Sequence, residues 1–164
     1  MSFPLEGFVF DPVAGKPARE EHTVLPLPLC LLRCAQSASL ALRYCAYAAS
    51  KACQVVVVCH EDTRLPVMPE LEVWTRVRLR YVAGHEELCS YLVLLQDVPH
   101  LLVIAEVERY ARGAREALRL GGLLRAALEH GHDSLALAYS SAFLSTEMAN
   151  AYQVYGSLFE PDWA

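Results

Sequence analysis

The stretch Gln54-Val55-Val56-Val57-Val58-Cys59 decides the fold class, because it holds four consecutive valines within a segment bounded by polar residues. β-Branched residues favour strands, and a strand that is apolar at every position is covered on both faces, as in parallel sheets. The run Leu101–Glu106 has the same character. Together the two runs predict an α/β fold with a buried, mostly parallel central sheet.

Other strands and helices are expected to alternate around these two runs. The hydrophobic pattern predicts strands at Leu29–Arg33, Val77–Tyr81 and Ser134–Tyr139, with Ala151–Tyr155 as a candidate sixth strand, and helices at Ser37–Lys51, Glu86–Gln96 and about Tyr110–His130. This alternation is typical of a three-layer architecture with helices on both faces of the sheet. We expect an irregular N-terminal arm over residues 1–23 and one domain over 24–164.

Composition excludes several classes of protein. With 164 residues, 54% hydrophobic and 20% charged, the chain suits one folded domain and is not of disordered type. Its apolar runs are far shorter than the ~20 residues that span a bilayer, so no membrane is expected. Met1–Phe10 carries no Lys or Arg, so no export signal is indicated. The net charge of -5 argues against a nucleic-acid binder that works alone.

The densest basic patch consists of Arg76, Arg78 and Arg80. If the strand begins before them, all three lie on one wet face, opposite Val77, Leu79 and Tyr81. A solvated edge strand is one interpretation, and a DNA contact within a larger complex is the other.

Six cysteines lie inside apolar periodic stretches, where buried free thiols of a reducing compartment are expected. Their spacing matches no zinc-binding pattern, so neither a metal nor a disulfide framework is predicted.

The end of the first strand is where a phosphate-binding loop would lie in this kind of fold. Such a loop needs glycines, a lysine for the phosphates and a Ser or Thr for magnesium. The segment here contains no glycine and no lysine, so we interpret its polar positions as a degenerate loop, comprising Cys34, Gln36, Ser37 and Ser39. Ser37 or Ser39 is expected to cap the following helix.

The end of the fourth strand also lacks the usual acid. Magnesium-dependent ATPases place an Asp there, and Ala105 takes that position in this chain. Glu106 and Glu108 follow, and each is interpreted as an acid at a helix start. We find no catalytic constellation, and no cofactor is predicted.

Three stretches carry a family resemblance: Leu29–Ser50 with Gln54–Pro66, Val77–Tyr81 leading into Glu87–Leu95, and His100–Tyr110. From about Leu25 onward the chain resembles degenerate RecA-type recombinase paralogues, and among them the small RecA-like partner of the SWIM-domain protein in animal Shu complexes. The vertebrate members of this family keep a glycine-lysine loop and an Asp at the end of the Walker-B strand. This chain departs from the family at both places, which puts ATPase activity in doubt.

The resemblance implies a RecA-like core and a role in homologous recombination and DNA repair, in the nucleus of a eukaryote or otherwise in the cytoplasm. It implies a protein partner, which is a SWIM-domain protein, a recombinase or another RecA-like paralogue, and contact with single-stranded DNA only through the complex. The apolar arm, with Phe3, Phe8 and Phe10, and the exposed edge of the sheet are the expected partner surfaces.

Three alternatives stay open at this stage. A bacterial cell-division inhibitor that binds a tubulin-like GTPase is also RecA-like and lacks a phosphate-binding loop. A subunit of an Elongator-type ring has the same general fold. The last alternative is an enzyme with a diverged nucleotide site that uses Glu106 and Glu108.

Overall fold

A computed structural model describes residues 10–11, 16–17, 29–33, 37–50, 52–65, 74–131, 134–140 and 144–159. Six of the described strands form one sheet in the order β5-β4-β6-β7-β3-β8, and every neighbouring pair is parallel. The bounds of these strands are β3 Leu29–Leu32, β4 Val55–Cys59, β5 Val77–Tyr81, β6 Leu101–Ile104, β7 Leu135–Tyr139 and β8 Ser157–Phe159. The predicted three-layer α/β fold, with the parallel sheet of a RecA-like core, is confirmed.

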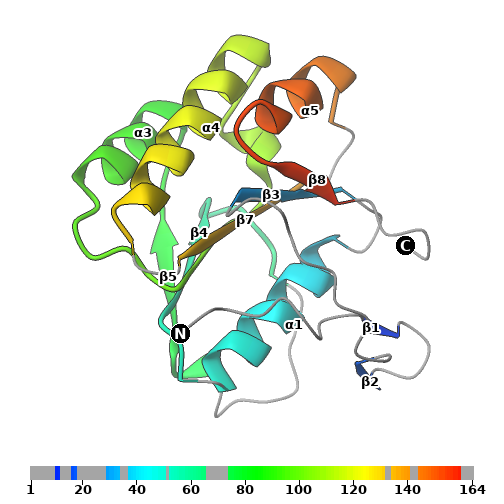
Figure 1. Cartoon of the computed structure of the whole chain (residues 1–164), viewed down its shortest axis with the longest axis vertical. Helices are drawn as coiled ribbons and strands as arrows, with labels where there is room; N and C mark the ends of the chain where they lie inside the picture. Colours follow the sequence, from blue (N-terminus) through cyan, green and yellow to red (C-terminus); the bar gives the residue numbers. More distant parts are fainter. Residues whose placement is uncertain are drawn as a thin grey trace.

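Helices cover both faces of the sheet (Figure 1). Helix α1 (Ser37–Ser50) lies on one face, whereas α3 (His85–Leu94), α4 (Ala114–Glu129) and α5 (Thr146–Gln153) lie on the other. A two-residue pair, β1 (Phe10–Asp11) with β2 (Lys16–Pro17), stands apart from the sheet. Within the described ranges, no helix combines the length and apolar character needed to cross a membrane.

Strand alternation divides the core into two clusters. Val55, Val57 and Cys59 pack with α1, whereas Val58 and the alternate residues of the other strands pack with α3, α4 and α5. Strands β6 and β7 are buried at every position, as expected of strands with helices above and below them.

The C-terminal part of the fold differs from the sequence prediction. Ala151–Tyr155 is not a strand, because helix α5 runs through Gln153. Ser145 caps this helix, since its hydroxyl accepts a hydrogen bond from the backbone N–H of Met148 at 3.3 Å. The sixth strand, β8, begins after Gly156, where a Cβ atom would lie 2.6 Å from the carbonyl oxygen of Leu29. Only glycine allows β8 to approach β3 this closely.

The long helix also begins later than its pattern predicts. A 3₁₀ turn at Val107–Arg109 comes first, and α4 begins only at Ala114. Tyr110 lies between them, fully buried, and its hydroxyl donates to the carbonyl of Val82 at 3.3 Å. The apolar spacing that suggested helix at this residue therefore reflects core packing in a loop.

Strand β5 lies at one edge of the sheet, and the prediction of a single wet face is wrong for it. Leu79 is 43% exposed and Tyr81 is 58% exposed. Both lie on the same face of the sheet as α1, which covers the inner strands of that face. Both faces of β5 are therefore open over most of its length, because the described helices lie over the inner strands.

Candidate functional site

The carboxyl end of the sheet, where the strands point their C-terminal residues, is the usual ligand-binding end of such folds. Ala105 follows β6 and is completely buried, with its N–H bonded to the carbonyl of Val58 at 2.9 Å. Glu106 comes next in the left-handed conformation, with φ 52°. A non-glycine residue pays a conformational cost there, and such strain collects at functional or tightly constrained sites.

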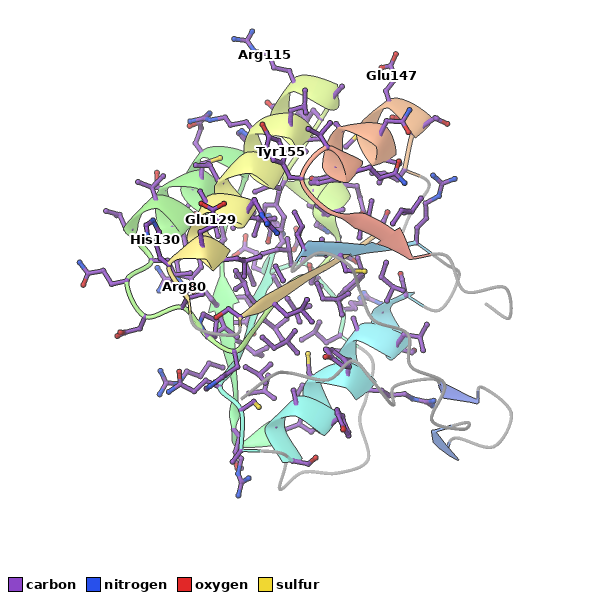
Figure 2. All side chains as sticks on the ribbon, in the orientation of Figure 1. Arg80, Arg115, Glu129, His130, Glu147 and Tyr155 are labelled. Carbon is purple, nitrogen blue, oxygen red and sulfur yellow. The ribbon has the colours of Figure 1, made fainter. Side chains whose placement is uncertain are left out.

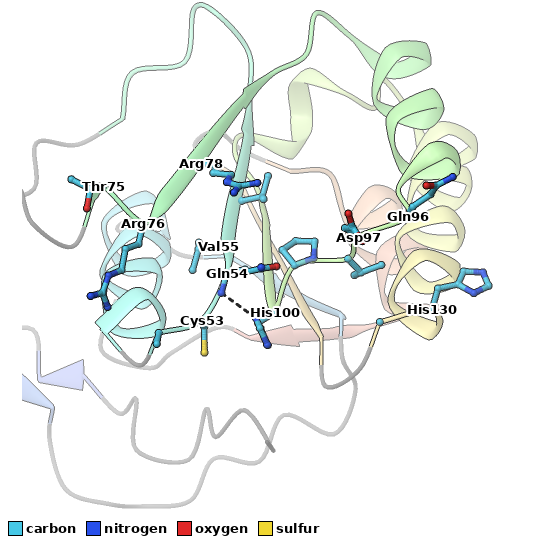
Figure 3. A pocket seen from close by; sticks show the side chains of 15 residues that line it. Cys53, Gln54, Val55, Thr75, Arg76, Arg78, Gln96, Asp97, His100 and His130 are labelled. Carbon is cyan, nitrogen blue, oxygen red and sulfur yellow. Dashed lines mark hydrogen bonds between the residues drawn. The ribbon is translucent and has the colours of Figure 1, made fainter.

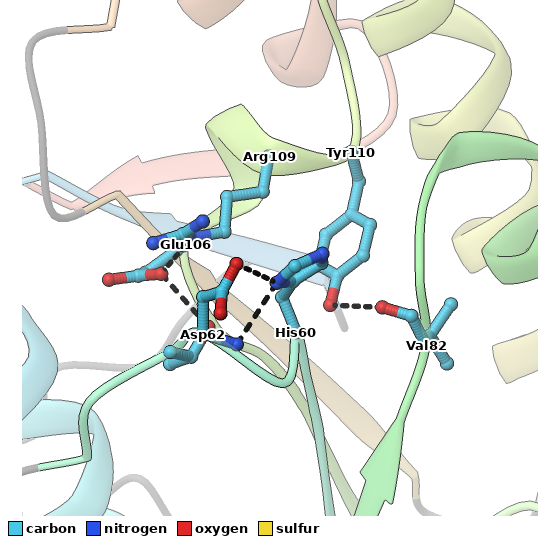
Figure 4. Close-up of polar contacts among 7 residues, drawn as sticks. His60, Asp62, Val82, Glu106, Arg109 and Tyr110 are labelled. Carbon is cyan, nitrogen blue, oxygen red and sulfur yellow. Dashed lines mark hydrogen bonds and ion pairs between the residues drawn. The ribbon is translucent and has the colours of Figure 1, made fainter.

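Glu106 is held by partners from two loops (Figure 4). The hydroxyl of Thr63 donates to Oε2 of Glu106 at 2.9 Å, and Nε of Arg109 forms an ion pair with the same oxygen. The hydrogen bond that Arg109 donates to Glu106 raises the pKa of Arg109. The Glu106 side chain is only 13% exposed, so these contacts tie the loop after β4 to the loop after β6.

The predicted phosphate-loop position is closed by another long-range hydrogen bond. Ser37 is buried, and its hydroxyl donates to the carbonyl of Ser140 at 2.5 Å, across 103 positions of the chain. Ser37 is the first residue of α1, and the prediction that Ser37 or Ser39 caps this helix has no capping hydrogen bond to support it among the described residues. Ser39 lies within the first turn of α1 and is half-buried. Cys34 and Gln36 lie outside the described residues.

His60 and Asp62 form a local turn beside this network. The backbone N–H of Asp62 donates to Nδ1 of His60 at 3.1 Å, which makes that nitrogen an acceptor. The Asp62 carboxylate lies 3.5 Å from the same nitrogen and forms an ion pair only with a protonated imidazole. These contacts organise the loop after β4.

Cys59, the last residue of β4, brings a thiol to the carboxyl end of the sheet. Burial raises the pKa of Cys59, and the Glu106 carboxylate raises it further. A buried thiol with a raised pKa is a poor nucleophile at neutral pH. All five described cysteines are buried and free, as predicted for them, and Cys34 lies outside the described part. In the described ranges, no three His, Cys, Asp or Glu side chains gather closely enough to hold a metal.

The three arginines predicted as one patch have different surroundings. Arg76 lies in the turn before β5 and donates to the carbonyl of Ala49, near the end of α1, at 3.2 Å. Arg80 stacks over the ring of Tyr91 on α3 at 5.5 Å from its centroid. The prediction that all three share one face is wrong, because the strand begins after Arg76. Arg78 has no hydrogen bond or ion pair with any described residue.

A pocket of about 970 Å³ opens at the opposite, amino end of the sheet (Figure 3). Gln54 and Val55 of the β4 start, Arg78 of β5 and His100 before β6 line it, and the end of α4 contributes His130. This site was not predicted from the sequence, because only the carboxyl ends of the strands were considered as ligand sites. Arg78 was the one signal for it. Gln54 and His100 carry no signal, because polar side chains before buried strands are common.

Most of the partner-binding residues predicted in the N-terminal arm lie outside the described residues. Phe3 and Phe8 lie outside the described residues, and Phe10 is described only by its backbone pairing with Pro17. Comparison with protein-family models and with curated proteins finds no match to this chain.

Proposed function

We propose that this chain is a non-catalytic RecA-like subunit of a Shu-type recombination complex. In this role it pairs with a SWIM-domain protein or another RecA-like paralogue, in the nucleus of a eukaryotic cell. The pair promotes assembly of recombinase filaments on single-stranded DNA, which this subunit contacts through the complex. Recombination enters the proposal through the sequence resemblance, and the geometry supports the non-catalytic part.

The observation that carries the non-catalytic part is the pairing of Glu106 with Arg109 and Thr63 beside a buried Ala105. Magnesium requires carboxylate or other oxygen ligands that are free to coordinate it. The acid at this strand end instead has a guanidinium on Oε2, and Ala105 offers no side-chain oxygen. An ion at Oε2 would have to displace Arg109 and Thr63.

The edge strand supports a function through protein contacts. Leu79 and Tyr81 are exposed on the same face of β5, which ends the sheet. Apolar side chains on an open edge strand invite association, and proteins that work alone usually protect such edges. We therefore place the proposed partner surface on β5.

The test is affinity capture of the tagged chain from its own cells, with the partners identified by mass spectrometry. Recovery of a SWIM-domain protein, a recombinase or a RecA-like paralogue would support the proposal. We expect Leu79→Asp to reduce this recovery about tenfold or more. Leu118→Asp, at an apolar position of α4 that is 39% exposed, is the matched control and should leave recovery unchanged. Recovery of a tubulin-like GTPase or of Elongator-type ring subunits would overturn the recombination function.

A magnesium-ATP titration tests the non-catalytic part separately. We expect no saturable binding that depends on Glu106. Saturable magnesium-ATP binding that Glu106→Ala abolishes, in a variant that remains folded, would contradict the proposal and favour an enzyme with a diverged nucleotide site.

A further inference from the structure

The pocket at the amino end of the sheet has a rigid frame. His100 accepts a hydrogen bond at its carbonyl from the N–H of Leu135 at 2.9 Å, and the N–H of Leu101 donates to the carbonyl of Gln54 at 3.1 Å. The N–H of Gln54 donates in turn to Nδ1 of His100 at 3.0 Å. The positions of Gln54 and His100 are therefore fixed by the strand ladder before any ligand arrives.

The hydrogen bond from Gln54 also determines which nitrogen of the His100 ring carries the hydrogen. A nitrogen that accepts from a backbone N–H carries no hydrogen, so in the neutral ring the hydrogen is on Nε2. Nε2 is then a hydrogen-bond donor. His100 is half-buried, and its ring is one of the walls of the pocket.

Arg78 supplies a positive charge to this pocket that no other described residue neutralises. It is exposed and forms no hydrogen bond or ion pair with the described part of the chain, unlike Arg76 and Arg80. A guanidinium presents several donors in a planar fork that matches the oxygens of a phosphate. Arg78 therefore favours a phosphate group over a neutral ligand.

The negative features of the pocket narrow the choice of ligand. Helices α1, α3 and α4 end near it, and helix C-termini carry partial negative charge. The Asp97 carboxylate also lines it, exposed and without a described partner. A bare anion gains little in such mixed surroundings. A phosphate attached to a group that donates hydrogen bonds complements both Arg78 and Asp97, and Val98 with Pro99 adds an apolar wall.

We propose that this amino-end pocket binds a nucleoside phosphate, with the phosphate on Arg78 and His100 and with donor groups of the base or ribose toward Asp97. The nucleoside phosphate is either a free mononucleotide or one unit of a nucleic-acid strand. This pocket lies at the opposite end of the sheet from the nucleotide site of RecA-like enzymes. Binding of a nucleoside phosphate there goes beyond the adaptor function proposed above.

The experiment is a calorimetric titration of the full chain, in EDTA, with AMP in one arm and a 15-residue oligothymidylate in the other. Removal of magnesium suppresses any metal-dependent site at the carboxyl end. We expect saturable, salt-sensitive binding in at least one arm. Arg78→Ala should weaken it about tenfold, because it removes a charged donor. The matched control is Arg115→Ala, an exposed arginine on the first turns of α4 at the far side of the molecule (Figure 2).

A second variant tests the other half of the ligand at an exposed loop position, where a loss caused by misfolding is not expected. Asp97→Asn removes the carboxylate that accepts from the base or ribose and should weaken binding about threefold. Saturation by AMP identifies a free nucleotide as the ligand, and saturation by the oligonucleotide alone identifies a strand. The inference is overturned if neither ligand saturates at millimolar concentration, or if Arg78→Ala and Arg115→Ala bind equally well. Partner capture by Asp97→Asn, which lies outside β5, should be normal, so failure here and failure of the adaptor function are separate results.

Discussion

The two ends of the parallel sheet use their polar side chains in opposite ways. At the carboxyl end, Ser37 is bonded to Ser140, and Glu106 is bonded to Thr63 and Arg109. At the amino end, Arg78 and Asp97 have no partner among the described residues and face a pocket of about 970 Å³. Charged groups that lack a described partner and line a pocket therefore lie at the end that this architecture usually leaves unused.

This difference teaches that the carboxyl end of such a sheet can serve as a structural part of the fold. Long-range hydrogen bonds between loops stabilise it. The backbone of Glu106 has a left-handed conformation of the kind found at functional sites, and its side chain joins two loops.

The largest effect that would sharpen this comparison is expected for Ala105→Asp, which places an acid at the strand end. Ala105 is completely buried in the cluster beneath α1, so we expect a loss of about 3 kcal/mol or more in the free energy of unfolding. Urea unfolding measures it. Ala114→Asp, at the first position of α4 where an acid is favoured, is the control and should change stability by less than about 0.5 kcal/mol. A stable Ala105→Asp protein that binds magnesium would break the comparison.

A smaller effect is expected at Glu106, where the side-chain bonds and the backbone strain can be separated. Glu106→Ala removes both side-chain contacts and should cost about 1–3 kcal/mol of stability. Glu106→Gly removes the same contacts but tolerates φ 52°, so it should be about 1 kcal/mol more stable than the Ala variant. Thermal and urea unfolding of the two variants gives this difference. Equal stability would mean that the backbone there is not strained.

The smallest effect is expected for the bond between Ser37 and Ser140. Ser37→Ala removes one buried hydrogen bond and should cost about 1 kcal/mol. Ser39→Ala, two residues along the same helix and half-buried, should stay within about 0.5 kcal/mol of the parent. A larger loss in Ser39→Ala than in Ser37→Ala would restore the capping role that the sequence suggested.

The fold was predictable from sequence where strands are buried on both faces. Gln54–Cys59 and Leu101–Glu106 predicted β4 and β6 because continuous β-branched or aliphatic runs have few other uses in a domain of this size. Prediction failed at Ala151–Tyr155, where a short apolar segment fits a strand and a helix equally well. The Ser145 cap, six residues earlier, was the signal that would have decided for helix.

The candidate site was predictable only in part. That Ala105 follows the buried strand could be predicted, because the apolar run shows where β6 ends. The partners of Glu106 could not, since Thr63 is 43 residues away and only the folded loops bring it near. Arg76 shows a further limit, because a shift of one residue in the strand start moves its side chain from the shared face to the end of α1.

The position of β3 has a consequence for how the protein is made. This strand is the first of the sheet to be synthesised, yet its two neighbours, β7 and β8, are the last. Leu29–Leu32 must therefore wait until β7, more than 100 residues later, has left the ribosome before it can pair on either side. Pairings between such distant segments slow folding and prolong the exposure of apolar strands. A chain that stopped before Ser157 would leave β3 as a bare, fully apolar edge, so premature termination should give aggregates and not a smaller folded domain.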